Sequence, residues 1–219
     1  MEMELIANPT PDWRVSVNAA KSSAVSWEIG RDWLSFIREH TAVWAKYADA
    51  PAYNDPTRTV RDLYSSLSNT LTLMQATDGR RVESAREWRV NVVTRYSFRG
   101  GWLKNVFVGG TGQWRSANVV GYRTHGIPNG FPFPGLGGTV IASDIEQPMS
   151  GDPIITLDAF AGYSRKIFRD RIDWRVQLNI RNLLGDRSRI VQQVYSNGDV
   201  RQFNLPKPRQ FILTNTFSF

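Results

Sequence analysis

Strict alternation between apolar and polar residues is the feature that most constrains the fold of this chain. The clearest case runs from Ile172 to Arg181, where every second residue is apolar and the residues between are polar. Successive side chains of a β-strand point to opposite faces, so this segment is predicted to be a strand with one apolar and one polar face. The same period recurs at about residues 2–8, 13–19, 88–98, 103–115, 154–165 and 211–219. The sequence therefore predicts an all-β fold of about seven strands.

The lengths of the strands and of their connections indicate a membrane barrel. Strands of soluble domains have about 5–6 residues, whereas a tilted membrane-spanning strand needs about 9–11. The connections alternate between short ones (Pro9–Asp12, Phe98–Trp102 and Ile167–Arg171) and long ones (Lys21–Glu87, Asn118–Pro153 and Asn182–Pro208). Outer-membrane barrels have short periplasmic turns and long extracellular loops. We therefore predict a segment of an antiparallel up-and-down transmembrane β-barrel.

Aromatic residues gather at the short-turn end of nearly every predicted strand. They are Trp13, Tyr96, Phe98, Trp102, Tyr163, Trp174, Phe217 and Phe219. Such a position is typical of the aromatic girdle at a membrane interface. A soluble β-sandwich is the alternative, since it produces the same alternation. A sandwich offers no reason for placing large aromatic residues at one end of its strands, so the barrel is favoured.

Composition excludes several classes of chemistry. The chain of 219 residues has no cysteine, which excludes disulfides, iron–sulfur clusters, Cys-ligated zinc and a cysteine nucleophile. Its two histidines, His40 and His125, lie far apart and in no metal-binding motif. We therefore predict no metal, no cofactor and no enzymatic activity.

The chain carries 27 Lys and Arg against 20 Asp and Glu, a formal charge of +7. The basic residues alternate with apolar ones and form no continuous run, so we predict no nucleic-acid partner. Attraction of outer loops to anionic lipopolysaccharide and arginines inside the barrel account for this excess.

The first long connection has a helical period of its own. Apolar residues recur every three or four positions in two stretches, Trp33, Phe36, Ile37, His40, Trp44 and Tyr47, and Val60, Leu63, Tyr64, Leu67, Leu71 and Met74. We predict two packed amphipathic helices separated by a break at Ala50–Pro56, forming a helical extracellular loop insert at residues 26–80. His40 lies on the apolar stripe and is expected to be a packing residue.

Three further motifs resemble the C-terminal part of the barrel of TonB-dependent outer-membrane receptors. They are W-R-V-N-V-V-T-R-Y-S-F from Trp88 to Phe98, N-I-R-N-L-L-G-D from Asn179 to Asp186, and P-R-Q-F-I-L-T-N-T-F-S-F from Pro208 to Phe219. The resemblance implies energy-coupled import of a scarce ligand, such as siderophore-iron, cobalamin or a glycan, across the outer membrane of a Gram-negative bacterium. It also implies that Leu213, Phe217 and Phe219 form the signal read by the barrel-assembly machinery.

A transporter barrel of this class has about 22 strands, and an open sheet edge leaves unsatisfied backbone groups in lipid. Residues 1–219 are therefore expected to be a C-terminal fragment of a receptor. The partners implied are outer-membrane lipid and lipopolysaccharide, the missing plug domain and remaining strands, the TonB complex, the assembly machinery and a small-molecule ligand.

Two sets of residues are candidates for ligand contact. The first is expected to line the lumen, either as ligand contacts or as ion-paired lining, and comprises Arg89, Arg95, Arg115, Asp158, Asp173, Arg175 and Arg181. The second lies in the Gly- and Pro-rich connection Asn118–Pro153, expected to be a flexible surface loop, and comprises Tyr122, His125, Phe131 and Phe133. A passive porin-like channel is an alternative function. A barrel enzyme is another, although nothing in the sequence places a base beside a nucleophile.

Overall fold

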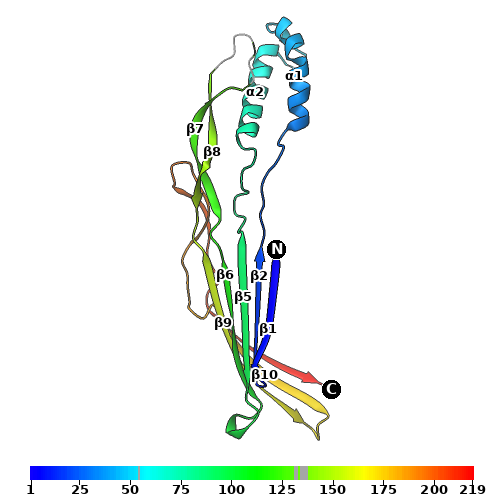
Figure 1. Cartoon of the computed structure of the whole chain (residues 1–219), viewed down its shortest axis with the longest axis vertical. Helices are drawn as coiled ribbons and strands as arrows, with labels where there is room; N and C mark the ends of the chain where they lie inside the picture. The colour runs from blue at the N-terminus through cyan, green and yellow to red at the C-terminus, as the bar shows by residue number, and fades with distance from the viewer. Residues whose placement is uncertain (54, 131–132, 134–137) are drawn as a thin grey trace.

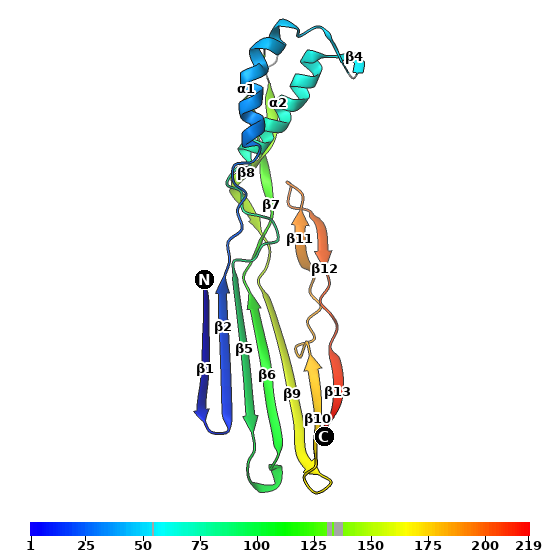
Figure 2. The ribbon, with the colours of Figure 1, turned by 90° about the vertical axis from the view of Figure 1, so that its right-hand side faces the viewer.

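A single antiparallel sheet of seven strands forms the body of the molecule in a computed structural model that describes residues 1–53, 55–130, 133 and 138–219 (Figure 1). Its strand order is β1-β2-β5-β6-β9-β10-β13, so each strand lies beside the next sheet strand along the chain. Figure 2 shows the strands side by side, with the short turns at one end and the longer connections at the other. The predicted fold class, an all-β segment of about seven antiparallel strands with a helical insert, is confirmed.

The sheet strands lie close to their predicted bounds. They are β1 (Glu2–Thr10), β2 (Trp13–Lys21), β5 (Trp88–Ser97), β6 (Val106–Arg115), β9 (Ile154–Ile167), β10 (Ile172–Arg181) and β13 (Gln210–Ser218). The largest difference is at β6, which was expected to begin at Leu103. The 3₁₀ helix η1 (Gly101–Leu103) occupies that position, and Asn105 has a positive φ of 73° before the strand begins.

The short turns are held to one another at their end of the sheet. Arg99, in the β5–β6 connection, forms an ion pair with Asp12 in the β1–β2 turn at 2.5 Å and donates a hydrogen bond to the carbonyl oxygen of Pro11 at 2.6 Å. We call this end the short-turn end and the opposite end the loop end.

The long connections contain regular structure. Helices α1 (Arg31–Lys46) and α2 (Val60–Ala76) flank the small hairpin formed by β3 (Pro51–Ala52) and β4 (Asp55–Thr59). The other two connections hold hairpins, β7 (Val119–Pro128) with β8 (Thr139–Ser150), and β11 (Ile190–Val194) with β12 (Val200–Asn204). The expectation of a flexible loop at Asn118–Pro153 was therefore wrong, because most of that segment is paired in the β7–β8 hairpin.

The two helices and the tip of the β7–β8 hairpin pack together at the loop end, and we call this unit the cap (Figure 1). Its core comprises Ile37, Ala48, Tyr64, Leu71 and Phe133, all buried. At the tip, Ser68 and Thr72 of α2 both donate to the amide oxygen of Asn129, at 2.7 and 3.0 Å. The helical insert and the hairpin therefore share one hydrophobic core.

The start of α2 is fixed by a capping box. The Thr59 hydroxyl accepts a hydrogen bond from the backbone of Asp62, and the Asp62 carboxylate accepts one from the backbone of Thr59. The hydrogen bonds that the Asp62 carboxylate accepts from the backbone N–H and the hydroxyl of Thr59 hold the pKa of Asp62 below its ordinary value.

The apolar stripe of α1 divides between the core and the surface. Ile37 is buried, whereas Trp33, Phe36 and Tyr47 are exposed. His40 stacks on Phe36, with ring centroids 4.2 Å apart, and its Nδ1 donates to the Phe36 carbonyl oxygen at 2.7 Å. The structure thus gives His40 packing contacts within its own helix. Neither helix in the described part of the chain is long and apolar enough to cross a lipid bilayer.

Candidate functional site

The strand register places all seven predicted lumen residues on one face of the sheet. Residues that pair across an antiparallel ladder share a face. Arg89 is paired with Arg115, Asp173 with Lys166, and Arg175 with Ser164. Continuing the same register across the sheet puts Arg95, Asp158 and Arg181 on this face too. We call it the polar face.

The opposite face is mostly apolar and largely uncovered, with Thr94, Arg165 and Asn215 among its few polar residues. Its residues include Leu5, Val17, Val92, Leu178 and Leu213. Leu5 is 59% exposed and Leu213 65% exposed, values that a packed sheet face would not show. This apolar face is therefore an extended exposed hydrophobic surface of the described chain.

Aromatic side chains border the apolar face at both ends. At the short-turn end are Trp13, Tyr96, Tyr163, Trp174 and Phe217, as predicted, and at the loop end are Trp88 and Trp114. Trp88 and Tyr96 are eight residues apart on β5, a rise of about 26 Å along the strand. Strands of an outer-membrane barrel are tilted by about 35–45° and its apolar band is about 25 Å tall, so this stretch of β5 would span about 20 Å of that height. The one hydroxyl between them on β5, that of Thr94, accepts a hydrogen bond from the Trp13 indole at 2.8 Å.

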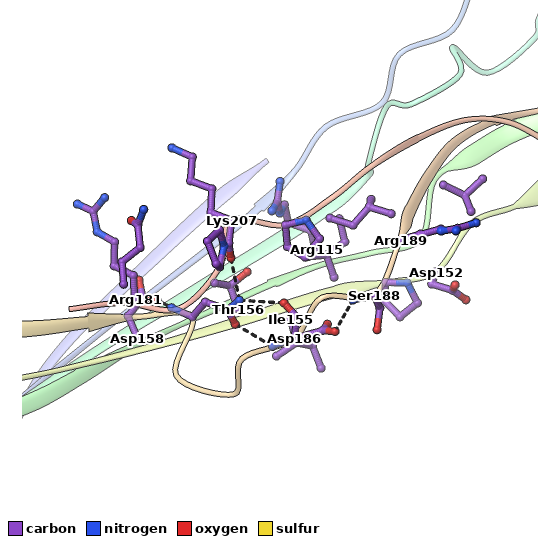
Figure 3. Close-up of a pocket in the computed structure, with 18 residues that line it drawn as sticks. Arg115, Asp152, Ile155, Thr156, Asp158, Arg181, Asp186, Ser188, Arg189 and Lys207 are labelled. Carbon is purple, nitrogen blue, oxygen red and sulfur yellow. Dashed lines mark hydrogen bonds between the residues drawn. The ribbon is translucent and has the colours of Figure 1, made fainter. Parts of the chain in front are cut away.

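A cavity of about 330 Å³ opens at the loop end, between β9, β10 and the chain leading into β13. Figure 3 shows its cationic and acidic side chains spread along the cavity, from separate segments of the chain. The charged lining residues are Arg115, Arg181, Arg189, Lys207, Asp152, Asp158 and Asp186. Three of the predicted lumen residues, Arg115, Asp158 and Arg181, therefore meet in this cavity, whereas Arg95 and Arg175 lie near the short-turn end.

The Asn-Leu-Leu-Gly-Asp motif builds the wall of this cavity. Asn182 has a left-handed φ of 51°, and its side-chain amide donates to the carbonyl oxygens of Asp186 and Lys207, each at 2.9 Å. The backbone of Asn182 donates in turn to Asp158 Oδ1 at 2.8 Å. Asp158 therefore has a positioning contact at the end of β10, in addition to its place in the cavity.

Asp186 closes the same turn. It accepts hydrogen bonds from Ser188, which keep its pKa below the ordinary value of a carboxyl group. The carboxylate is thus ionised at neutral pH beside the basic residues of the cavity.

The four candidates in the connection Asn118–Pro153 have different surroundings. Phe133 is 2% exposed and stacks on Tyr64, with ring centroids 4.3 Å apart. Tyr122 is also buried, its hydroxyl donating to the Arg81 carbonyl oxygen at 2.9 Å, and burial raises its pKa. His125 is exposed, with Nδ1 3.8 Å from Asp144 Oδ2. Phe131 lies outside the described residues.

The predicted assembly-signal residues occupy the last strand and the chain end. Leu213 and Phe217 lie on the apolar face of β13, and Phe219 follows the strand and is exposed. Their placement on β13 agrees with the alternation read from the sequence, while the signal itself stays a prediction.

Sequence reasoning missed five polar cavity residues and one polar-face residue. The five line the cavity but lie outside the alternating segments that supplied the candidates: Asp152, Asn182, Asp186, Arg189 and Lys207. Phe107 lies on the polar face and is 3% exposed. The alternation predicts polar, solvent-accessible residues on this face and therefore does not predict a buried phenylalanine there. The glycines in β6 and β9 are the sequence signal for its close packing.

The described residues contain no group of three or more His, Cys, Asp or Glu side chains arranged for a metal ion. The polar face can bind charged or polar groups through its guanidinium, ammonium and carboxylate side chains. The cavity at the loop end is lined by seven of these charged residues.

Neither a protein-family model nor a curated protein matches the chain. Among solved structures, it is similar to the ferripyoverdine receptor of the outer membrane of Pseudomonas aeruginosa, with 13% identity, a TM-score of 0.45, and coverage of 98% of this chain and 18% of that one. It is also similar to the ferric-catecholate import receptor Fiu from E. coli, with 16% identity, a TM-score of 0.46, and coverage of 99% and 20%. Both of these solved structures are receptors. The chain spans about a fifth of their length.

Proposed function

We propose that residues 1–219 are a wall segment of a TonB-dependent outer-membrane receptor that imports a small ligand by energy-coupled transport. The observation that carries this proposal is the two-faced sheet: seven antiparallel strands with an exposed apolar face on one side and a charged face on the other. An apolar sheet face of this size is unfavourable in contact with water, so another apolar surface is expected to cover it. Outer-membrane lipid is the occupant that the aromatic borders favour.

The polar face then faces the barrel interior. The cavity at the loop end would lie toward the outside of the cell, where the arginines and Lys207 meet the incoming ligand. Arg115 and Arg181 are the lumen candidates best placed for contact, and His125 is the accessible loop candidate. The ligand classes under this proposal are siderophore-iron, cobalamin and glycan.

The helical insert at residues 26–80 would be extracellular, since it stands at the end opposite the short turns (Figure 2). The receptor's remaining strands would close the barrel at the edges of β1 and β13, and its plug would occupy the interior. Through its plug the receptor would engage the TonB complex. Leu213, Phe217 and Phe219 would present the signal to the assembly machinery, and lipopolysaccharide would surround the outer rim.

A passive porin-like channel is the alternative, because a wide barrel without a plug is an open pore. A barrel enzyme is less well supported. In the described part of the chain, neither His40 nor His125 is hydrogen-bonded to a serine or threonine hydroxyl that would act as a nucleophile.

Uptake measured with and without energy separates the receptor from the porin. Cells expressing the full-length protein would be given labelled ferric siderophore, labelled cobalamin or a labelled glycan, each with and without a protonophore. Uptake of one of these that stops on protonophore addition, and in a strain without TonB, supports the receptor. Uptake that continues unchanged in both cases would identify a passive channel.

Arginine substitutions then test the cavity. Arg181→Gln is expected to raise the ligand concentration needed for half-maximal uptake by about 10- to 150-fold, since one charge-assisted contact contributes roughly 1.5–3 kcal/mol. Arg165→Gln, on the apolar face near the short-turn end, is the matched control and is expected to leave uptake unchanged. Equal effects of the two substitutions would remove the cavity from the binding site.

A further inference from the structure

The apolar face of the sheet carries two cationic side chains, one near each end. Lys21 is paired with Trp88 at the loop end, and Arg165 is paired with Trp174 near the short-turn end. None of the described sheet residues on this face is Asp or Glu. A cation on this face therefore has no carboxylate of the same face to neutralise it.

The two cations differ in their surroundings. Lys21 has a partner within the chain, since its Nζ atom lies 5.3 Å from the centroid of the Trp88 ring, within the range of a cation–π contact. Arg165 is exposed, and its side chain has no ion pair, hydrogen bond or cation–π contact with the described residues. Arg165 is therefore a charge on the apolar face without a partner in the described chain.

Arg165 lies at the level of the aromatic border. In the ladder Trp174 is opposite Arg165, and Phe217 is opposite Trp174 on the other side. The Trp174 ring also meets the Tyr163 ring edge to face, with centroids 6.1 Å apart. Large aromatic residues gather where the acyl chains of a bilayer give way to headgroups, and an arginine there extends its charged end toward the headgroups. Against lipid, Arg165 would therefore reach the level of the phosphates.

The adjoining turn adds to the positive charge. Arg169 and Arg171 are exposed in the β9–β10 connection, and neither side chain forms an ion pair with the described residues. With Arg165 they give three cations against the one carboxylate of Asp170, a local charge of +2. Lys166 belongs to the other side of the sheet, where it is opposite an acidic residue on the polar face. The excess of charge is thus on the side of Arg165.

The surroundings of Arg165 indicate which anion fits. Phe168, in the same turn, is 72% exposed, so apolar surface and unneutralised guanidinium groups lie side by side. A free anion would match the charges but leave the apolar surface uncovered. A phospholipid matches both, with its acyl chains on the apolar face and its phosphate against the arginines. A headgroup that contains an amine brings its own cation, so the local charge favours a headgroup without one.

We propose that Arg165, together with Arg169 and Arg171, binds the phosphate of an anionic phospholipid such as phosphatidylglycerol in the inner leaflet of the outer membrane. This assignment rests on the proposed function, because it requires the apolar face to lie against lipid and the short turns to be periplasmic. Guanidinium groups match phosphate oxygens with two parallel hydrogen bonds. The three arginines thereby give one end of the lipid-facing surface a preference for one class of headgroup.

Lipid binding by the full-length protein tests the proposal. The purified protein in neutral detergent is titrated with phosphatidylglycerol or with phosphatidylethanolamine, and bound lipid is counted by native mass spectrometry. The unmodified protein should bind phosphatidylglycerol more tightly. Arg165→Gln should weaken phosphatidylglycerol binding by about fivefold, the factor expected for one basic residue at an anionic lipid surface, and should narrow the difference between the two lipids.

Lys166→Gln is the matched control. It removes the same charge one residue further along β9, on the polar face, and should leave phosphatidylglycerol binding unchanged. Arg165→Lys keeps the charge on the apolar face and should retain most of the binding. Arg169→Gln with Arg171→Gln changes only the exposed turn, so it tests the site even if Arg165→Gln does not fold, and it should also weaken binding.

Three results would overturn the proposal. One is an equal loss of phosphatidylglycerol binding in Arg165→Gln and Lys166→Gln, and another is equal affinity of the unmodified protein for the two lipids. The third is displacement of phosphatidylglycerol by inorganic phosphate at millimolar concentration, which would assign the arginines to a free anion.

Failure of this inference is distinguishable from failure of the proposed function. If the protein is recovered in the outer membrane as a heat-modifiable species, but Arg165→Gln binds phosphatidylglycerol as the unmodified protein does, the lipid site alone is wrong. If the protein is absent from the outer membrane, the barrel assignment fails first. Ligand uptake reports on the cavity and not on this site, because the two lie at opposite ends of the sheet.

Discussion

The seven-stranded sheet and the cap are stabilised in different ways. The cap buries a compact set of side chains, with Ile37 and Leu71 almost fully removed from solvent. Within the described strands of the sheet, Phe107 is the large apolar side chain that reaches such burial, while Leu178 and Leu213 on the apolar face are partly exposed. The cap resembles the interior of a small soluble domain, and the sheet does not.

The difference shows that the cap is stabilised by contacts within the chain, whereas the sheet requires other molecules to cover its faces. Burial of apolar surface within the chain is what stabilises the cap. The sheet has its backbone hydrogen bonds but leaves both faces to be covered by something else, which we infer to be lipid on one side and polypeptide or ligand on the other. The following experiments, on the full-length protein, test this contrast.

The largest effect is expected from Ile37→Ala. Removing a fully buried side chain from the cap core should cost about 2–5 kcal/mol. Hydrogen exchange in detergent should show faster exchange of the amides of α1 and α2, with β5 and β10 unchanged. Val43→Ala, on the exposed side of α1, is the control, and equal protection in the two variants would contradict the assigned core.

Leu178→Arg should destabilise the sheet by about 2–4 kcal/mol, because it places a charge near mid-strand on the apolar face, which we propose lies against lipid. Its neighbour on the polar face offers the matched control, since Gln177→Arg should be close to neutral. Urea unfolding in lipid vesicles measures both. Equal losses of stability would show that the assignment of faces, or of the bilayer itself, is wrong.

Gly109→Ala should cost about 1–3 kcal/mol, because the added Cβ would overlap the Thr94 carbonyl oxygen and the Phe160 ring. Gly100→Ala has nothing within 4 Å of the new atom and is expected to have little effect. The same urea titration distinguishes them. A neutral Gly109→Ala would argue against the close packing of aromatic rings over the polar face.

Thr59→Ala should cost about 1 kcal/mol through loss of the capping box of α2. Thr70→Ala, an exposed position inside the same helix, should be neutral or slightly stabilising because alanine is the better helix former. Amide exchange of the first turn of α2 is the measurement. If both variants show the same amide exchange, the capping box at Thr59 does not stabilise the helical insert.

The smallest effect is expected from pH. The folded pKa of Asp62 is depressed by its hydrogen bonds to Thr59, so the stabilisation is present above the unfolded value of about 3.9 and is lost as the pH falls through the lower folded value. Protection of the first amides of α2 should fall in that acidic range. Asp62→Asn should remove this pH dependence, and an unchanged profile would show that another group is responsible.

Much of the sheet could be predicted because its period is local. In β10 and β13 the polarity of most residues predicts which face of the sheet they occupy. Once the two strands are adjacent, Leu178 and Leu213 lie on the same face and pair. Short turns with polar or glycine residues mark where strands end. The start of β6 was placed too early because the 3₁₀ turn at Gly101–Leu103 interrupts an otherwise alternating stretch.

The candidate site was predicted in part. Alternation correctly assigned Arg115 and Arg181 to the polar face, but the residues that complete the cavity, Arg189 and Lys207, lie in connections without a period. Phe133 looked like a loop aromatic in sequence, whereas contact with Tyr64 buries it. Such contacts join segments distant in sequence, and no local pattern records them.

The sequence by itself determined the seven strands, their two faces and the helical insert, because a period of two or 3.6 residues is a property of neighbouring residues. The tertiary structure decided which residues meet: the shared core of the insert and the β7–β8 hairpin, the cavity at Asn182, and the packing of Phe107 against Gly162. These depend on strand order, on the close approach that Gly109 and Gly162 permit, and on the packing of separate segments. Their free energy is set by burial and by charge neighbours, which exist only once the chain has folded.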